Sequence, residues 1–153
     1  MKTRQLHLAL TTNPHTYHVY GGIYPRDKLP RYIAKSRPVA IIANTHKHFQ
    51  TGEHWVAFFF NKDGRAVFFD SYGEPPRYPE FTTFLINNSM SYVYNTQRIQ
   101  GFDKTCGIYC LFFLYNMTRL TAPSMLQKLT TSSWWENDAW IRQWMKLNFK
   151  LDV

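Results

Sequence analysis

The chain has 153 residues, of which 44% are hydrophobic and 18% aromatic, and its formal net charge is +8. This length suits one domain with its own core, and the composition excludes a disordered chain. No apolar run reaches the ~20 residues of a membrane span, and the apolar segment near residue 6 is too short for a secretory signal. The two cysteines, Cys106 and Cys110, cannot form a disulfide framework. We therefore expect a single domain over residues 1–153 in a reducing intracellular compartment, without a membrane.

Positive charge gathers in the first 37 residues, where seven Lys and Arg residues stand against one Asp, a balance of +6. A basic segment of this kind suggests a polyanion partner, usually nucleic acid. A solvated surface that serves only solubility is the alternative, and the sequence leaves both open. The candidate DNA-binding residues are Arg26, Lys28, Arg31, Lys35 and Arg37.

The first predicted elements are strands. Residues 39–45 form a short, β-branched run that is typical of a buried strand. Residues 54–60 and 65–70 flank Asp63-Gly64, which is a hairpin signal.

The length of this hairpin loop decides which side chains can meet. A two-residue loop pairs Ala57 with Asp70 and puts Asp70 on the face opposite His54. A three-residue loop, with Gly64 in the left-handed conformation, pairs Val56 with Asp70 instead. His54 then becomes a diagonal neighbour of Asp70 on the same face, about 7–8 Å away by backbone. Cooperation between His54 and Asp70 requires the second register, or a bulge with the same effect.

The next segments are expected to bring the chain to its second, cysteine-containing half. Residues 76–88 predict a helix that ends at Asn87-Asn88, and residues 91–98 predict a strand that leads to Gln100. Residues 106–117 are apolar on every face, which indicates a buried central helix with Cys106 at its N-terminus. Asp103 or Thr105 could cap that helix.

The last predicted element is an amphipathic helix. Ser133 and Glu136 have the spacing of a capping box. After them, Trp140, Ile141, Trp144 and Met145 recur at helical spacing and predict a face that covers the core. Stacking of nucleic-acid bases is another use for the tryptophans of this region, but the spacing favours core packing for Trp134, Trp135, Trp140 and Trp144.

Four residues carry the groups that cysteine-based acyl transfer needs. Cys106 supplies a thiol nucleophile, His54 a base, Asp70 a carboxylate that orients the base, and Gln100 an amide that can donate to an oxyanion. The start of a helix favours a thiolate, which distinguishes Cys106 from an ordinary buried cysteine. Cys110, one turn further, is interpreted as a core residue.

Each of these residues also has a structural interpretation. His54 could be merely solvated, Asp70 could cap a turn, and Gln100 could be an ordinary loop residue. A zinc site is a further alternative, because His46 and His48 add ring nitrogens to the set. However, Cys-x-x-x-Cys inside a helix is not a zinc-knuckle spacing, so no metal is expected.

The combined motifs resemble the clan of adenovirus and SUMO-specific proteases, and within it the adenain family. His54 is followed by Trp55, and Gln100 stands six residues before Cys106-Gly107. The likeness covers roughly residues 20 to 118, and its segments are Gly22-Ile23-Tyr24, Leu29-Pro30, residues 39–45, Gly52 to Phe58, Phe69 to Gly73, and Ile99 to Cys110. The chain departs from that pattern by Asp70 in place of Glu and by a shorter C-terminal part. It also has no cysteine in residues 87–92, where adenoviral relatives attach an activating peptide by a disulfide.

The resemblance implies an α+β fold, in which a small mixed sheet packs on a buried central helix that carries the nucleophile and is flanked by further helices. It implies a cysteine endopeptidase that cleaves viral precursor proteins near glycine during virion maturation, with Trp55 and Gly107 shaping the substrate cleft. The expected oxyanion hole combines the Gln100 amide with the Cys106 backbone N–H. We expect a monomer in the virion and host nucleus that requires no cofactor, although DNA or a noncovalently bound peptide could stimulate it.

Two other functions stay open. The chain could be a protease for ubiquitin-like conjugates, which belongs to a neighbouring branch of the same clan. It could also be a basic nucleic-acid-binding module on a catalytically dead protease fold.

Overall fold

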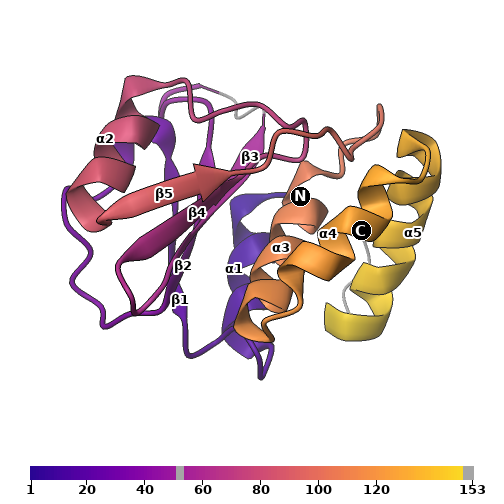
Figure 1. The fold of residues 1–153 in the computed structure, drawn as a ribbon, viewed down its shortest axis with the longest axis horizontal. Coiled ribbons are helices and arrows are strands. Elements are labelled where there is room, and N and C mark those ends of the chain that lie inside the picture. Colours follow the sequence, from indigo (N-terminus) through magenta and orange to yellow (C-terminus); the bar gives the residue numbers. More distant parts are fainter. Residues whose placement is uncertain (51–53, 150–153) are drawn as a thin grey trace.

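The computed structural model describes residues 1–50 and 54–149. Within these ranges the strands lie mainly in the first two thirds of the chain, and three helices follow one another at its C-terminal end (Figure 1). They are α1 (Thr3–Thr12), β1 (Tyr20–Pro25), the short 3-10 helix η1 (Arg26–Lys28), β2 (Val39–Asn44), β3 (Trp55–Phe60), β4 (Arg65–Phe69), α2 (Pro79–Asn88), β5 (Ser91–Tyr94), α3 (Cys106–Thr118), α4 (Ala122–Thr130) and α5 (Trp134–Phe149).

The strands form one mixed sheet in the order β1-β2-β3-β4-β5. The two outer pairs, β1 with β2 and β4 with β5, are parallel, and the two inner pairs are antiparallel. Helix α2 lies on one side of the sheet, and α1, α3, α4 and α5 lie on the other (Figure 1). The α+β fold class predicted from the sequence is therefore confirmed.

Both faces of the central strands are buried, and their side chains alternate between two cores. Ile42, Ala57 and Phe59 pack toward α3. Ile41 and Phe58 point the other way, toward α2. This alternation is the period of a β-strand, and it explains why β2 and β3 consist almost entirely of apolar residues.

The hairpin between β3 and β4 has the register that the chemistry requires. Phe60 pairs with Ala66, and the Asn61 N–H donates to the Arg65 carbonyl at 2.8 Å, which leaves a three-residue loop from Lys62 to Gly64. Gly64 has φ +89°, the left-handed conformation expected for it. The same register places Asp70 opposite Val56, one step beyond the pair of Ala57 with Phe69. Of the two loop lengths that the sequence left open, the structure has the three-residue loop, which lets His54 and Asp70 share a face.

Helix α3 is the buried central helix that its apolar residues predict. All residues from Cys106 to Asn116 are buried. Phe113 stacks on Phe69 of the sheet with ring centroids 4.7 Å apart. Helix α1, which was not predicted from the sequence, buries its apolar side in the same core.

Two predicted boundaries were wrong for identifiable reasons. Helix α2 begins at Pro79 rather than Pro76, because Pro79 occupies the first helical position and holds Tyr78 in an extended conformation. Strand β5 ends at Tyr94 rather than Arg98. The Asn95 side chain bonds both the backbone N–H and the carbonyl of Asp70, at 3.0 and 2.7 Å, so the chain leaves the sheet there.

The C-terminal helix follows its apolar stripe but not its predicted cap. Ile141, Trp144 and Met145 are buried, as expected. The Ser133 hydroxyl has no hydrogen-bond partner in the described ranges, so the predicted capping box is not formed. Core packing was also wrong for Trp135, which is 70% exposed, while Trp134 and Trp140 are only partly covered. None of the helices within residues 1–50 and 54–149 is long and apolar enough to cross a bilayer.

Candidate active site

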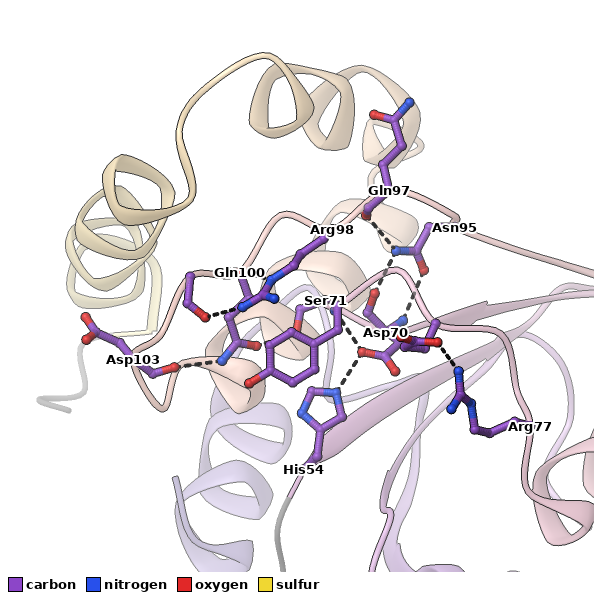
Figure 2. A network of polar contacts seen from close by, with 12 residues as sticks. His54, Asp70, Ser71, Arg77, Asn95, Gln97, Arg98, Gln100 and Asp103 are labelled. Carbon is purple, nitrogen blue, oxygen red and sulfur yellow. Dashed lines mark hydrogen bonds and ion pairs between the residues drawn. The ribbon is translucent and has the colours of Figure 1, made fainter.

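The predicted residues come from four parts of the chain, two strand ends, one loop and one helix start, which meet in space. His54 directly precedes β3, Asp70 directly follows β4, Gln100 lies in the loop before α3, and Cys106 is the first residue of α3. Each of the four is buried, with at most 9% of its surface exposed. Figure 2 shows His54, Asp70 and Gln100 at the end of the sheet.

The His54 ring is held on one edge and on one face. Its Nε2 lies 2.7 Å from Oδ1 of Asp70, and the same oxygen accepts the Tyr72 N–H at 2.8 Å. The Tyr72 ring stacks on the imidazole with centroids 4.5 Å apart. Because Nε2 is occupied by Asp70, Nδ1 is the ring nitrogen left to bond Cys106. Asp70 thus orients the imidazole toward the thiol.

The electrostatics favour an ion pair between His54 and Cys106. Burial opposes a charged imidazole, but hydrogen bonds to Asp70 and Cys106 and their negative charges outweigh it and raise the pKa of His54 to about 9. Burial also opposes a charged thiolate, yet the hydrogen bond and positive charge of His54 lower the pKa of Cys106 below its ordinary value. Both shifts favour transfer of the Cys106 proton to the His54 imidazole.

Two hydrogen bonds fix the Gln100 side chain. Its Oε1 accepts a hydrogen bond from the Ser71 hydroxyl. Its Nε2 donates to the Asp103 carbonyl at 2.7 Å (Figure 2). A primary amide carries two N–H groups, and among residues 1–50 and 54–149 the second N–H of Gln100 has no partner.

A cleft of about 650 Å³ opens beside these residues and is lined by Gln100, Cys106, Trp55, Tyr72 and Phe102, among others. The Trp55 indole N–H donates to the Met1 carbonyl at 2.9 Å, which fixes the ring as a wall of the cleft. Gly107 does not line this space. A side chain there would approach Trp55 to 3.3 Å and Met1 to 3.2 Å, so Gly107 permits the packing of that wall.

The second cysteine lies in the core, as predicted. Cys110 is fully buried between the sheet and the helices. Burial raises the pKa of its thiol well above the ordinary value, which makes it a poor nucleophile.

Neither predicted cap of α3 acts as a cap. Thr105 occupies the N-cap position, but its side chain makes no capping hydrogen bond. Its hydroxyl bonds Asp138 of α5 at 3.2 Å instead. The Asp103 carboxylate lies 3.7 Å from Arg142.

The predicted DNA-binding residues are not equivalent. The Arg26 guanidinium donates to the Thr45 carbonyl at 2.8 Å and to Glu80 at 3.2 Å, so it serves the fold and its charge is neutralised. Arg37 donates to the carbonyls of Ile33 and Lys35. The exposed candidates are Lys28, Arg31 and Lys35.

Several residues of the site were not predicted from the sequence. Asn95 fixes the backbone of Asp70, Ser71 fixes Gln100, and Arg98 and Asp138 bind the loop that contains Gln100. Asp138 could have been singled out from the sequence, because it falls on the apolar stripe of the helix with Ile141 and Met145. A polar residue on an apolar stripe needs a buried partner.

The fold thus places a thiol at a helix start beside an imidazole, and a carboxylate holds that imidazole from its other side. No family model matches the chain. Over 89 residues the chain is 29% identical to R355, a proposed thiol protease of Acanthamoeba polyphaga mimivirus, and this match covers 52% of the chain and 30% of that protein. The chain thus spans less than a third of the length of this relative.

Two solved structures are also similar to the chain. Both are crystal structures of the pS273R protease of ASFV, African swine fever virus. The first has a TM-score of 0.49 and 16% identity, covering 86% of this chain and 59% of that chain. The second, the selenomethionine form, has a TM-score of 0.38 and 23% identity, covering 67% of this chain and 39% of that chain.

Proposed function

We propose that the chain is a cysteine endopeptidase. The observation that carries the proposal is the buried contact of 2.7 Å between His54 Nε2 and Asp70, with Cys106 at the start of α3 and its pKa lowered by the same imidazole. A histidine with only a structural role does not have to lower the pKa of a neighbouring thiol. A histidine that activates a cysteine nucleophile does have to lower it. The match to a viral thiol protease over 89 residues supports this assignment.

The first half of the reaction forms a thioester. The Cys106 thiolate attacks the peptide carbonyl carbon, and the carbonyl oxygen takes the negative charge. The free Gln100 N–H and the Cys106 backbone N–H stabilise that oxyanion. When the tetrahedral intermediate collapses, the C–N bond breaks and His54 gives its proton to the leaving amine.

The second half restores the enzyme. His54, now neutral, accepts a proton from a water molecule that attacks the thioester carbonyl. The C–S bond then breaks, the peptide acid leaves, and the thiolate and imidazolium are re-formed. Asp70 keeps the imidazole in place and stabilises its charged form through both halves.

For the substrate we propose viral precursor proteins cut near glycine, as the resemblance to adenain implies. The wall formed by Trp55 beside Cys106 favours residues without a side chain at the scissile bond. The other candidate within the same chemistry is a tail of a ubiquitin-like protein, which also presents glycines. We further propose that no covalently attached peptide is needed, because Cys110 is fully buried and cannot accept one.

The test compares two conservative variants of the cysteines. Cys106→Ala should abolish hydrolysis of internally quenched peptides that contain Gly-Gly, while Cys110→Ala should retain most of the activity. Melting curves of both variants serve as the folding control. A Cys106→Ala protein with full activity would end the protease assignment.

A substrate panel then separates the remaining possibilities. Glycine-containing precursor peptides and ubiquitin-like protein conjugates are offered to the wild-type protein, and an iodoacetamide label reports on the thiolate. A Cys106 that does not react with iodoacetamide, together with no cleavage of either substrate class, would favour the dead binding module.

A further inference from the structure

A buried carboxylate from the C-terminal helix binds the loop that carries Gln100. Asp138 of α5 is 2% exposed. Its Oδ1 accepts the Gly101 N–H at 3.0 Å and the hydroxyls of Thr105 and Tyr109 at 3.2 and 2.8 Å. Its Oδ2 accepts the Asp103 N–H at 3.3 Å.

All four partners of this carboxylate are neutral donors, and two of them are backbone groups of the loop. A buried carboxylate is costly unless it is fully hydrogen-bonded, so the donors and the acid fix one another. Burial, together with the bond to Asp138 and its negative charge, raises the pKa of Tyr109, so its hydroxyl keeps its proton and remains a donor.

Gly101 lets the loop approach the acid this closely. A side chain at Gly101 would place its Cβ 2.5 Å from Asp138 Oδ2 and 3.1 Å from the Trp134 carbonyl. The approach therefore depends on the missing side chain at one position of the loop.

Arg98 binds the opposite edge of the same loop. Its Nε donates to the Gln100 carbonyl at 2.7 Å and its Nη2 to the Gly101 carbonyl at 3.0 Å (Figure 2). The guanidinium lies over the rings of Trp134 and Tyr72, at 4.2 and 4.8 Å from their centroids. Two N–H groups of the loop thus bond Asp138, those of Gly101 and Asp103. Two of its carbonyls, those of Gln100 and Gly101, bond Arg98.

We propose that Asp138 is a positioning residue that holds residues 100–105 so that the free N–H of Gln100 and the N–H of Cys106 meet the oxyanion. This rests on the proposed function. The proposed role of Asp138 affects one of two reactions of the same thiolate and not the other. Peptide hydrolysis needs the oxyanion donors, whereas alkylation by iodoacetamide forms the C–S bond by displacing iodide and needs none.

The experiment compares Asp138→Asn with Asn116→Ala. The first substitution keeps the shape of the side chain but turns one acceptor oxygen into a donor, so at least one loop bond is lost. The control removes a buried amide at the other end of α3, where Asn116 bonds Phe112 and Thr121. Asn116 lies ten residues from Cys106, about 15 Å along the helix.

We expect Asp138→Asn to lower kcat for an internally quenched Gly-Gly peptide at least about tenfold, with KM within about twofold, because an interaction made only in the transition state is lost. The rate of Cys106 alkylation should stay within about twofold of wild type. Tyr109→Phe, which removes one donor to the same oxygen, should give a smaller loss of kcat. Equal losses in alkylation and hydrolysis, or unchanged hydrolysis, would overturn the proposal.

Hydrogen exchange tests the same anchor without any substrate. The amides of Gly101 and Asp103 should exchange at least about tenfold faster in Asp138→Asn and at the wild-type rate in Asn116→Ala. Unchanged exchange rates of these amides in Asp138→Asn would refute the role of Asp138 in holding the loop. A wild-type protein that cleaves no peptide would remove the proposed protease, while the exchange rates would still decide the role of Asp138 in the loop.

Discussion

The His54 and Cys106 pair has opposite pKa shifts, and this predicts two pH profiles that differ. Because the pKa of Cys106 is lowered, alkylation should remain fast well below pH 8.5, where an ordinary thiol is protonated. Hydrolysis also needs the proton of His54, so it should decline as pH rises through about 9 while alkylation continues. Stopped-flow alkylation and peptide hydrolysis across the same buffers measure this. Identical profiles at high pH would contradict the role of His54 as the acid.

Asp70 should control the upper limit of the hydrolysis profile. Asp70→Asn removes the negative charge that raises the pKa of His54, so the decline in hydrolysis should begin at lower pH. We also expect kcat to fall by between about 10² and 10⁴, since the imidazole loses its orientation. Asp63→Asn in the exposed hairpin loop is the matched control and should leave kcat unchanged. A decline at the wild-type pH in Asp70→Asn would show that Asp70 is not the partner of His54.

At the residue scale, the sequence predicted the groups that react but not those that hold them. Cys106, His54, Asp70 and Gln100 each belong to a motif with chemical meaning, and the structure brings them together. Asn95, Arg98 and Asp138 belong to no such motif. Asn95 and Asp138 bond backbone groups 25 and 35 residues away, which only the folded chain brings close. Arg98 bonds carbonyls only two and three residues ahead, but in an irregular loop whose shape no periodicity predicts. A local pattern carries little information on such contacts.

At the scale of elements, the hairpin of β3 and β4 depends on one glycine. Gly64→Ala should cost about 1–2 kcal/mol of unfolding free energy, because φ is +89° and other residues avoid this conformation. The new methyl group would also meet the Met90 sulfur, at 2.7 Å, but Met90 is exposed and can move. Urea unfolding of Gly64→Ala and of the exposed control Lys62→Ala measures the effect. A loss below about 0.5 kcal/mol for Gly64→Ala, which is typical of surface sites, would contradict it.

The same hairpin shows what sequence can predict about elements. Side-chain period and turn chemistry, which are local, predicted the hairpin but left two loop lengths open, and only the need to bring His54 to Asp70 favoured the register that the structure has. The start of α2 and the end of β5 did not follow, although both depend on residues visible in the sequence. The helix periodicity could not choose between the prolines at 76 and 79, and Asn95 ends β5 through a bond to Asp70, 25 residues away.

At the scale of the whole molecule, positive charge predicts sequence-independent binding to DNA. We expect the affinity to fall steeply with salt, because phosphate contacts release counterions. Replacing Lys28, Arg31 and Lys35 by Ala should reduce the slope of log K against log salt by about 0.9 for each phosphate that is no longer neutralised. Replacing Arg142 and Lys146 should change it less. Fluorescence anisotropy with duplexes of two unrelated sequences measures this.

The result that would contradict DNA binding is an affinity that does not depend on salt, or none at low salt. Lys150, a further basic residue at the C-terminal side, lies outside the described residues. Arg26 is a useful control within the basic segment, because its pairing with Glu80 at 3.2 Å predicts that its replacement changes stability rather than the salt slope.

The place of Asp138 in chain order has a consequence for the time at which the protein becomes active. The ribosome completes His54, Asp70 and Cys106 before Asp138, which follows Gly101 by 37 residues. At about 5–20 residues per second, Gly101 waits roughly 2–7 seconds in the nascent chain before the carboxylate that anchors its loop exists. If the proposed function and the proposed role of Asp138 hold, cleavage of peptides begins only after α5 has emerged and docked.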